Sequence, residues 1–367
     1  MEDRGIYIHI PFCRSRCPYC DFYSLLYRSG SMAEDYSRAV IRELEKTKLM
    51  YGGCASTLYI GGGTPSCIGG KLLADIICAA SEMCTSDAEI TVECNPSSCG
   101  PALFRELAAA GVNRISMGMQ SSCDSERRTL GRISPASAVN EAVESARIAG
   151  IDNISLDIML GVPGQTAASA VESARFCTAV GASHVSAYML KIEPDTNFYR
   201  RRDSLGLPDD DEVCDIYNAV CESLEESGFE QYEISNFARQ GFSSRHNLKY
   251  WNDMEYVGIG PSAHSFVNGR RYHYERDIDG FMSSPEPVDD GEGGDIEEYA
   301  MLRLRLTEGI RDSLMRERFG TGIPEYMYKN ALELPEGLAV ADGGGIRLTR
   351  KGFLVSNAAT VKILYGV

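Results

Sequence analysis

Three cysteines near the start of the chain have the spacing of a metal-binding motif. Cys13, Cys17 and Cys20 form the pattern CxxxCxxC directly after an apolar, strand-like segment. Three thiolates can ligate three irons of a [4Fe–4S] cubane and leave the fourth iron free for a cofactor or substrate. A structural zinc site usually needs four ligands in two short pairs, and no second pair lies nearby. The motif therefore predicts a cluster with one open iron.

A glycine-rich segment follows the second expected strand. Gly62, Gly63 and Thr64 belong to the sequence GGGTP. Glycine lets the backbone approach a ligand closely, and free N–H groups there can meet a carboxylate. The phosphate-loop pattern GxxxxGK[ST] is absent. The segment also fits a plain turn between a strand and a helix, so its position opposite the cysteine loop is what favours a ligand contact.

Four further polar residues stand at or near the ends of expected strands: Glu93, Gln120, Arg132 and Asp157. A parallel barrel places its binding residues at the carboxyl ends of its strands. Each of the four could equally be a helix cap or one half of a buried pair. Their shared placement favours a binding role.

Alternating strands and helices must position these residues. We expect strands over 5–10, 56–60, 88–94, 114–119, 153–160 and 184–190, and helices over 33–50, 71–83, 101–110, 135–149 and 167–180. Six strands joined by crossover helices predict a parallel sheet that is buried on both faces. The predicted fold is α/β, a partial (β/α)6 barrel.

The pattern weakens after residue 190. A helix over 211–227 and a strand over 229–234 continue the α/β layer, and residues 283–295 have the proline, glycine and acidic residues of a linker. A terminal hairpin is expected around the triple glycine at 343–345. We predict two units, a barrel over residues 1–235 and a smaller mixed α+β domain over residues 236–367.

Composition excludes several classes of function. The net charge is −16, from 36 Lys+Arg against 52 Asp+Glu, whereas nonspecific nucleic-acid binding needs a basic surface. We find no secretory signal, and no run approaches the ~18–20 apolar residues of a membrane span. We therefore expect a cytoplasmic protein without a membrane span. In that compartment disulfides are rare, so ten of the 13 cysteines are interpreted as small buried hydrophobic residues.

The CxxxCxxC motif resembles that of the radical S-adenosylmethionine (SAM) superfamily. In that family SAM binds the open iron, and its reductive cleavage gives a 5′-deoxyadenosyl radical. The blocks YIHIPFC, GGGTPS, NRISMG, LGVPGQT, HVSAY and YEISNFA resemble the oxygen-independent coproporphyrinogen oxidase group, from Tyr7 to about Tyr274. The resemblance implies an electron donor such as a flavodoxin or ferredoxin. It also implies a set of SAM contacts: Tyr7, Tyr19, Gly62, Gly63, Thr64, Glu93, Gln120, Arg132, Asp157 and Lys191.

Two branches of that group differ in their further motifs. In the coproporphyrinogen dehydrogenase branch, the cysteine motif resembles CxxxCxxCxC and the chain carries an N-terminal extension. Here Phe22 stands two residues after Cys20, and only six residues precede Tyr7. Both departures count against the dehydrogenase.

The segment from His246 to Trp251 fits HNxxYW, which resembles the HemW-type branch of heme chaperones. That resemblance implies binding of heme, with His246 as candidate axial ligand, and its delivery to an acceptor apo-protein. His264 and His273 are competing ligands. The residues alone also fit a loop with a capping histidine and two core aromatics. The alternatives are a coproporphyrinogen III oxidase or a radical SAM enzyme with another substrate.

Overall fold

A curved twelve-stranded sheet forms the centre of the molecule. The computed structural model describes residues 3–367; Met1 and Glu2, with which the first predicted unit begins, lie outside the described residues. The sheet has the order β14-β13-β12-β11-β1-β4-β5-β6-β7-β8-β10-β9. Its middle contains the six strands expected from the sequence: β1 (Arg4–Ile10), β4 (Ala55–Gly62), β5 (Cys84–Cys94), β6 (Arg114–Gln120), β7 (Asn153–Leu160) and β8 (His184–Met189). Neighbours in this row all pair in parallel.

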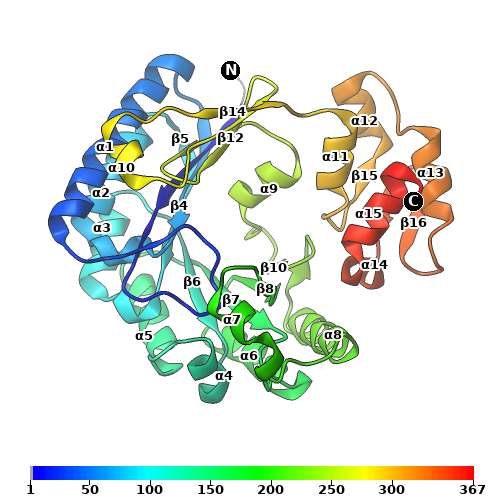
Figure 1. Cartoon of the computed structure of the whole chain (residues 1–367), viewed down its shortest axis with the longest axis horizontal. Helices are drawn as coiled ribbons and strands as arrows, with labels where there is room; N and C mark the ends of the chain where they lie inside the picture. Colours follow the sequence, from blue (N-terminus) through cyan, green and yellow to red (C-terminus); the bar gives the residue numbers. More distant parts are fainter. Residues whose placement is uncertain (1–2) are drawn as a thin grey trace.

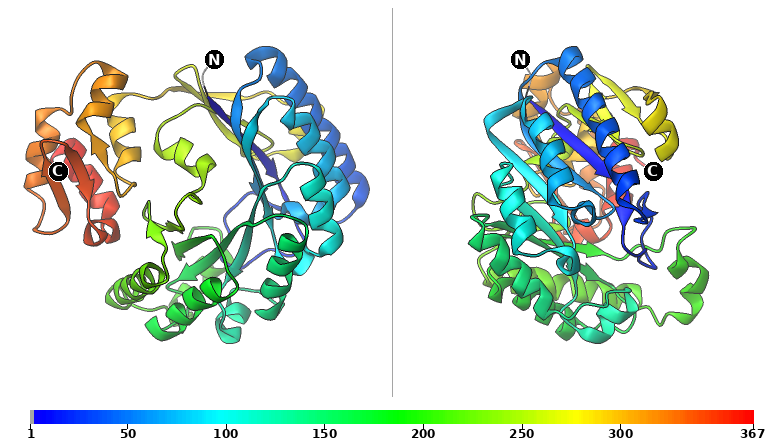
Figure 2. Two further views of the ribbon diagram at one scale, coloured as in Figure 1. Left: turned by 180° about the vertical axis from the view of Figure 1, so that it is seen from behind. Right: turned by 90° about the vertical axis from the view of Figure 1, so that its left-hand side faces the viewer.

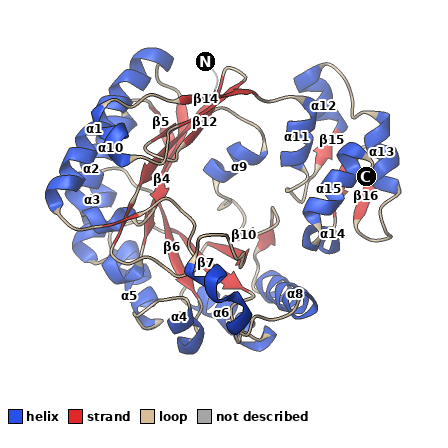
Figure 3. Cartoon of the chain, viewed as in Figure 1, coloured by secondary structure: helices blue, strands red, loops and turns tan. Residues whose placement is uncertain are grey.

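Helices cover the outer face of this sheet (Figures 1 and 3). They are α1 (Gly30–Tyr51), α2 (Gly70–Ser81), α3 (Pro101–Ala109), α4 (Asp124–Thr129), α5 (Ser137–Ile148) and α6 (Ala167–Ala179). Apolar side chains of the helices and the strands share one buried cluster. The predicted partial (β/α)6 barrel is confirmed, and of these six helices only the short α4 is absent from the sequence-based assignment.

Alternation along the strands separates the core from the inner face. In β1, Ile6, Ile8 and Ile10 belong to the buried apolar cluster beneath the helices. Successive strand residues point to opposite faces, so Tyr7 and His9 lie on the inner face. Polar and aromatic residues therefore line the inside of the barrel, where the predicted site residues also lie.

The sheet continues beyond β1 with four strands from later in the chain. β11 (Tyr256–Ile259) pairs in parallel with β1, and β12 (His264–Val267), β13 (Arg270–His273) and β14 (Val288–Glu292) follow as an antiparallel meander. The helix α10 (Ile278–Ser283) connects β13 to β14. The predicted division between residues 235 and 236 thus falls inside the sheet, because these strands are hydrogen-bonded members of it.

The segment over 283–295 is not simply a linker, because it contains β14. An acidic strand can pair here because the neighbouring strand is basic: Arg270 is the register partner of Glu292 and forms an ion pair with Asp289. At the other end of the sheet, the expected strand over 229–234 is reduced to β9 (Glu230–Gln231). β10 (Asn236–Ala238) pairs antiparallel with β8 and with β9, which is the last strand at that edge.

Three further helices flank the barrel. The expected helix over 211–227 is α8 (Asp210–Glu226), and the short α7 (Asn197–Arg201) precedes it. The HNxxYW segment forms a helix, α9 (Arg245–Trp251), rather than a loop. It lies on the inner side of the curved sheet (Figures 1 and 2). The side chain of Ser244 caps it by accepting from Asn247 N.

The remaining residues form a unit with its own apolar core, seen beside the barrel in Figure 2. Its elements are α11 (Ile296–Arg303), β15 (Ile310–Arg311), α12 (Asp312–Phe319), α13 (Glu325–Leu332), β16 (Ala339–Asp342), β17 (Gly345–Leu348), α14 (Arg350–Leu354) and α15 (Ser356–Tyr365). The predicted hairpin is confirmed as β16–β17. None of the helices within residues 3–367 has both the length and the apolar character that a bilayer crossing demands.

Candidate functional site

A short strand and the loop that follows it carry the three motif cysteines. Cys13 ends β2 (Phe12–Cys13), and Cys17 and Cys20 lie in the cysteine loop between β2 and β3 (Leu25–Leu26), which pair with each other. The backbone N–H of Cys20 donates to the carbonyl of Cys17 at 3.2 Å, which closes a turn between them. All three thiols are free and partly exposed. The Sγ of Cys13 lies 3.5 Å from the hydroxyl of Thr64. The cysteine motif is therefore in contact with the segment that contains Gly62, Gly63 and Thr64, called the glycine loop below.

The thiols form a donor set that suits iron. Burial raises the pKa of Cys13, and repulsion from Cys17 adds to this effect. Burial likewise raises the pKa of Cys20, with repulsion from both other thiols adding to it. A bound cation relieves such repulsion between thiolates. The loop, which the structure describes in full, contains no fourth cysteine, so the residues fit a [4Fe–4S] cluster with one open iron.

The glycine loop passes too close to its neighbours to carry side chains. Gly62 has φ of +110°, and a Cβ added there would lie 2.6 Å from the ring of His9. A Cβ added at Gly63 would lie 2.7 Å from the carbonyl oxygen of Phe12. A larger residue at Gly62 would therefore clash with β1, and one at Gly63 would clash with β2, which leads into the cysteine loop.

The expectation of free N–H groups in this loop is wrong for three residues. Gly62 N donates to the carboxylate of Glu93 at 3.1 Å. Gly63 N and Thr64 N donate to the carbonyls of Ile10 at 2.9 Å and of Phe12 at 2.7 Å. The loop continues the hydrogen bonding of the sheet, so these donors are already used.

Glu93 lies at the end of β5 and joins the glycine loop to the inner face. Its Oε1 accepts from the Tyr59 hydroxyl at 2.8 Å, and its Oε2 accepts from Gly62 N. Burial raises the pKa of Glu93 to about 7, and repulsion from Asp157 contributes. A buried carboxyl group that titrates near neutrality is typical of functional sites.

The other predicted polar residues lie on the neighbouring strands and loops. Gln120 ends β6 with φ of +73°, where the pairing with β7 is irregular. A Cβ added at Gly118 would lie 2.7 Å from Gln120 Nε2 and 3.1 Å from Arg132 Nη2, so these two side chains converge there. The Arg132 guanidinium also interacts with the side chain of Tyr19, which lies inside the cysteine motif. Burial raises the pKa of Asp157, and the Arg132 guanidinium partly offsets the rise.

Tyr7 joins this arrangement and Lys191 does not. Tyr7 is the register partner of Tyr59 on β4, and its hydroxyl lies 3.0 Å from Nδ1 of His9. Lys191 extends into solvent after β8, where its ammonium pairs with Glu193 at 2.5 Å. The structure thus brings together all the predicted SAM contacts except Lys191.

Sequence reasoning missed Tyr59 and Arg114. Tyr59 donates to Glu93, and Arg114 is 2% exposed at the start of β6. Its positive charge lowers the pKa values of Glu93 and Asp157, opposing the effect of burial. The sequence did contain a signal for Arg114, because a charged residue at the start of an apolar strand is unusual.

His246 lies in a closed hydrogen-bond network on α9. Its side chain is 1% exposed. Nδ1 lies 2.9 Å from the Thr57 hydroxyl and Nε2 lies 2.8 Å from the Tyr250 hydroxyl, while the ring stacks on Tyr59. Burial lowers the pKa of His246 to about 3, so the imidazole is neutral. Ligation of iron by His246 would require one of these two hydrogen bonds to break.

The remaining residues of the HNxxYW helix face other elements. Lys249 is buried and pairs with Asp3 at 2.8 Å. The Trp251 ring lies beneath the guanidinium of Arg305 from the C-terminal unit, 4.5 Å from its centroid. Within the described part of the chain, the buried indole N–H of Trp251 has no hydrogen-bond partner. The helix therefore connects the inner face of the barrel to the C-terminal unit.

Comparisons with known proteins identify both parts of the chain. Residues 7–177 match the family model of the radical SAM superfamily, which implies a [4Fe–4S] cluster and SAM. Residues 295–355 match the model of the HemN C-terminal domain, which begins where α11 does. In the solved structures, coproporphyrinogen III oxidase (HemN) from Escherichia coli has the same fold. Its TM-score is 0.83 at 20% identity, over 100% of this chain and 91% of the other.

Curated relatives match at higher identity and over nearly the whole length. The heme chaperone HemW of Bacillus subtilis is 34% identical over 96% of this chain and 97% of its own. HemW of Mycobacterium tuberculosis is 35% identical over 98% and 94%, and HemW of Escherichia coli is 37% identical over 83% of each chain. The chain therefore belongs to the HemW family within the radical SAM superfamily.

Proposed function

We propose that this protein binds heme and delivers it to acceptor apo-proteins, as a heme chaperone. The observation that carries this proposal is the match, over nearly the full length, to relatives named heme chaperones. The position of the HNxxYW helix supports it, because α9 lies on the inner face beside the predicted SAM residues. The oxidase alternative rests on a likeness of 20% identity, which is evidence of fold alone.

Within this proposal, Cys13, Cys17 and Cys20 hold the [4Fe–4S] cluster. When bound, the cluster supplies an electron and an open iron to SAM. Glu93 accepts hydrogen bonds from the SAM ribose. The other proposed contacts are Tyr7, Tyr19, Gly62, Gly63, Thr64, Gln120, Arg132 and Asp157. Lys191 can join them only after its ion pair with Glu193 opens.

His246 remains the proposed heme ligand, with His264 and His273 as competitors. Imidazole suits heme iron, but His246 must first release Tyr250 or Thr57. In a heme titration followed by absorbance, loss of the Soret shift in His246→Ala alone would support the assignment. An unchanged spectrum and affinity in that variant, with loss in His264→Ala, would move the ligand to β12.

Transfer of heme is the decisive test of function. Cluster-reconstituted protein loaded with heme is mixed with a heme-free globin as a generic acceptor, and the holo-globin spectrum is followed. We expect transfer that is faster than from heme-loaded serum albumin at equal heme affinity. Retention of heme at the albumin rate would contradict a chaperone function.

We further propose that a flavodoxin or ferredoxin reduces the cluster in the cytoplasm. Cell fractionation tests the location, and a reduction assay with each donor tests the electron transfer.

A further inference from the structure

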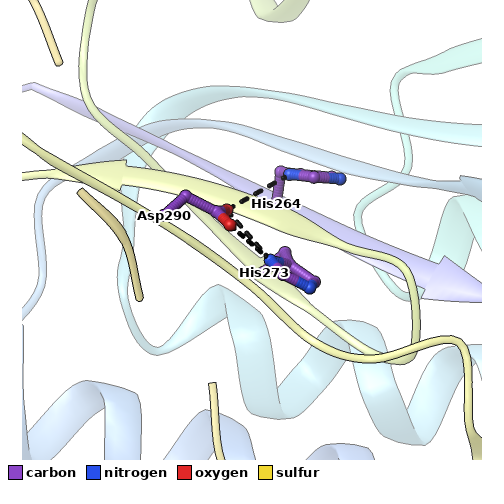
Figure 4. Close-up of side chains that lie close together, drawn as sticks. All are labelled: His264, His273 and Asp290. Carbon is purple, nitrogen blue, oxygen red and sulfur yellow. Dashed lines mark hydrogen bonds and ion pairs between the residues drawn. The ribbon is translucent and has the colours of Figure 1, made fainter. Parts of the chain in front are cut away.

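Three potential metal ligands from three neighbouring strands converge at the edge of the sheet (Figure 4). His264 on β12 and His273 on β13 are register partners, and their rings stack with centroids 5.4 Å apart. The Nδ1 of His273 lies 2.8 and 2.9 Å from the two carboxylate oxygens of Asp290, and the Nδ1 of His264 lies 3.9 Å from one of them. One ligand atom from each residue lies within 4.8 Å of the others.

The backbone itself creates this convergence. Directly opposed residues on antiparallel strands project to the same face, so the two imidazoles must lie side by side. On β14 the register shifts: Asp289 pairs with Tyr272 and Gly291 pairs with Arg271, which leaves Asp290 as an extra residue. A bulge of this kind re-aims a side chain. Here it turns the Asp290 carboxylate toward the histidines.

We propose that His264, His273 and Asp290 bind a divalent first-row transition-metal ion such as Zn²⁺. Two imidazoles and one carboxylate suit these ions better than they suit Mg²⁺ or Ca²⁺, which prefer oxygen ligands. The side chain of His264 is 64% exposed and that of Asp290 is 35% exposed. A three-ligand site at the surface leaves a coordination position open to water or to a group from another molecule.

The geometry favours a free ion over heme iron. The porphyrin occupies four equatorial positions of heme iron, so a protein supplies one axial ligand on each face of the ring. Three donors within 4.8 Å of one another occupy one side of an ion, which a porphyrin blocks. The three donors together therefore fit a free ion better than heme iron.

Neighbouring charges do not prevent a cation from binding. The guanidinium groups of Arg271 and Arg276 both act on His264. Arg271 already pairs with Asp253 at 3.2 Å and with Glu298 at 2.6 Å. On the other side, a carboxylate oxygen of Glu275 lies 4.0 Å from Nε2 of His273 and adds negative charge. The local balance around the three ligands is thus not cationic.

The site is mechanically connected to the segment that follows the cluster motif. Arg276 Nη2 donates to the carbonyl of Asp21 at 3.0 Å, and Ile278 N donates to the Tyr23 hydroxyl at 3.1 Å. These residues follow β13 directly. An ion that ties β12, β13 and β14 together should therefore also restrain the chain that supports the cluster loop.

Calorimetric titration with Zn²⁺ tests the proposal on the full chain with its cluster reconstituted under anaerobic conditions. The variants are Asp290→Asn and the double variant His264→Ala/His273→Ala. The matched control is Asp289→Asn, which removes the adjacent carboxylate that pairs with Arg270 instead. All cysteines are retained in every variant, so zinc bound by thiols cancels in the comparison.

We expect wild type and Asp289→Asn to bind one more zinc ion than the double variant, and Asp290→Asn to bind it at least about tenfold more weakly. Zinc should also slow backbone hydrogen exchange over residues 264–292 in wild type and in Asp289→Asn only. Equal zinc stoichiometry and affinity in wild type and the double variant would overturn the proposal. Heme binding by wild type is measured in a separate titration without zinc, so that failure of zinc binding and failure of heme binding are distinguishable.

Discussion

At the scale of single residues, Glu93 makes the most specific prediction about SAM. Its carboxylate is held by Tyr59 and Gly62 at the end of β5, with acceptor positions left for two hydroxyl groups. Loss of two charge-assisted hydrogen bonds in Glu93→Ala should cost about 2–4 kcal/mol, or roughly 30- to 1,000-fold in SAM affinity. Calorimetry of the reconstituted protein measures this. Unchanged affinity would assign Glu93 a structural role.

The same residue predicts a pH dependence. Because burial raises the pKa of Glu93 to about 7, its ionised form is lost as pH falls below neutrality. If SAM binds the ionised form, affinity should fall about tenfold between pH 8 and pH 6. In Glu93→Gln the profile should flatten over this range. A wild-type profile that is already flat would contradict the role of the carboxylate.

The raised pKa also has a consequence for stability. Burial favours the neutral acid, so the folded state binds the proton more tightly than the unfolded chain does. The contribution of Glu93 to stability is therefore full below the unfolded value of 4.5 and declines as pH rises toward about 7. Retaining an ionisable group at this cost is typical of a functional residue.

The cysteine motif predicts a second residue-level outcome. Replacing Cys13, Cys17 or Cys20 by Ala should remove most of the iron–sulfide absorbance after anaerobic reconstitution, because a cubane needs all three thiolates. Cys123→Ala is the matched control. That thiol is also partly exposed but contacts Ser125 at the start of α4. Full retention of iron and sulfide in the triple variant would place the cluster on other cysteines.

At the scale of elements, the sequence predicts strands and helices whose apolar residues recur regularly, and it misses elements that depend on contacts with distant residues. The six strands follow from apolar alternation, and the long helices follow from apolar residues three or four positions apart. The helix α9 has seven residues, too short to be stable alone. It forms because Glu89 accepts from the N–H groups of Arg245 and His246 and because His246 bonds Thr57 on β4. No local pattern encodes those distant partners.

The same reasoning explains the errors at the site. The cysteine spacing and the glycines are local features and could be read directly. Which N–H groups stay free depends on the backbone pairing of Gly63 with Ile10. The ion pair of Lys191 with Glu193 likewise depends on where its loop runs. Both depend on tertiary structure, which a local pattern does not encode. The pairing of β14 is likewise set by basic residues on β13 and not by its own hydropathy.

The contacts of Arg303 lead to a prediction about how strongly the C-terminal unit is held against α9. This residue of α11 is 1% exposed, and its guanidinium donates to the carbonyl of Gly309 at 3.0 Å and to the side chain of Asn252. A lysine cannot reproduce this fork. Arg303→Lys should lower the free energy of unfolding by about 2–4 kcal/mol, because buried acceptors lose their donor.

Urea unfolding followed by circular dichroism measures the change. The control is Arg38→Lys on α1, where the guanidinium pairs with the exposed Asp35. This exposed pair should contribute less than about 1 kcal/mol. If both variants unfold at the same urea concentration as wild type, Arg303 does not fasten the two units together.

At the scale of the whole molecule, a common fold carries a divergent function. The curved sheet and the C-terminal unit are shared with a coproporphyrinogen III oxidase at a TM-score of 0.83 and 20% identity. The relatives at 34–37% identity are named heme chaperones. A fold of this kind hosts many activities, so the choice between them must come from the site.

The site predicts that the protein does not convert coproporphyrinogen III to protoporphyrinogen IX, even with SAM and a strong reductant. Phe22 occupies the position of the last cysteine in the CxxxCxxCxC pattern of the dehydrogenase branch. It is 67% exposed within the cysteine loop. Anaerobic chromatography of the tetrapyrroles measures the outcome, with a known dehydrogenase in the same mixture as positive control. Product that depends on both SAM and Cys20 would return the chain to the oxidase branch.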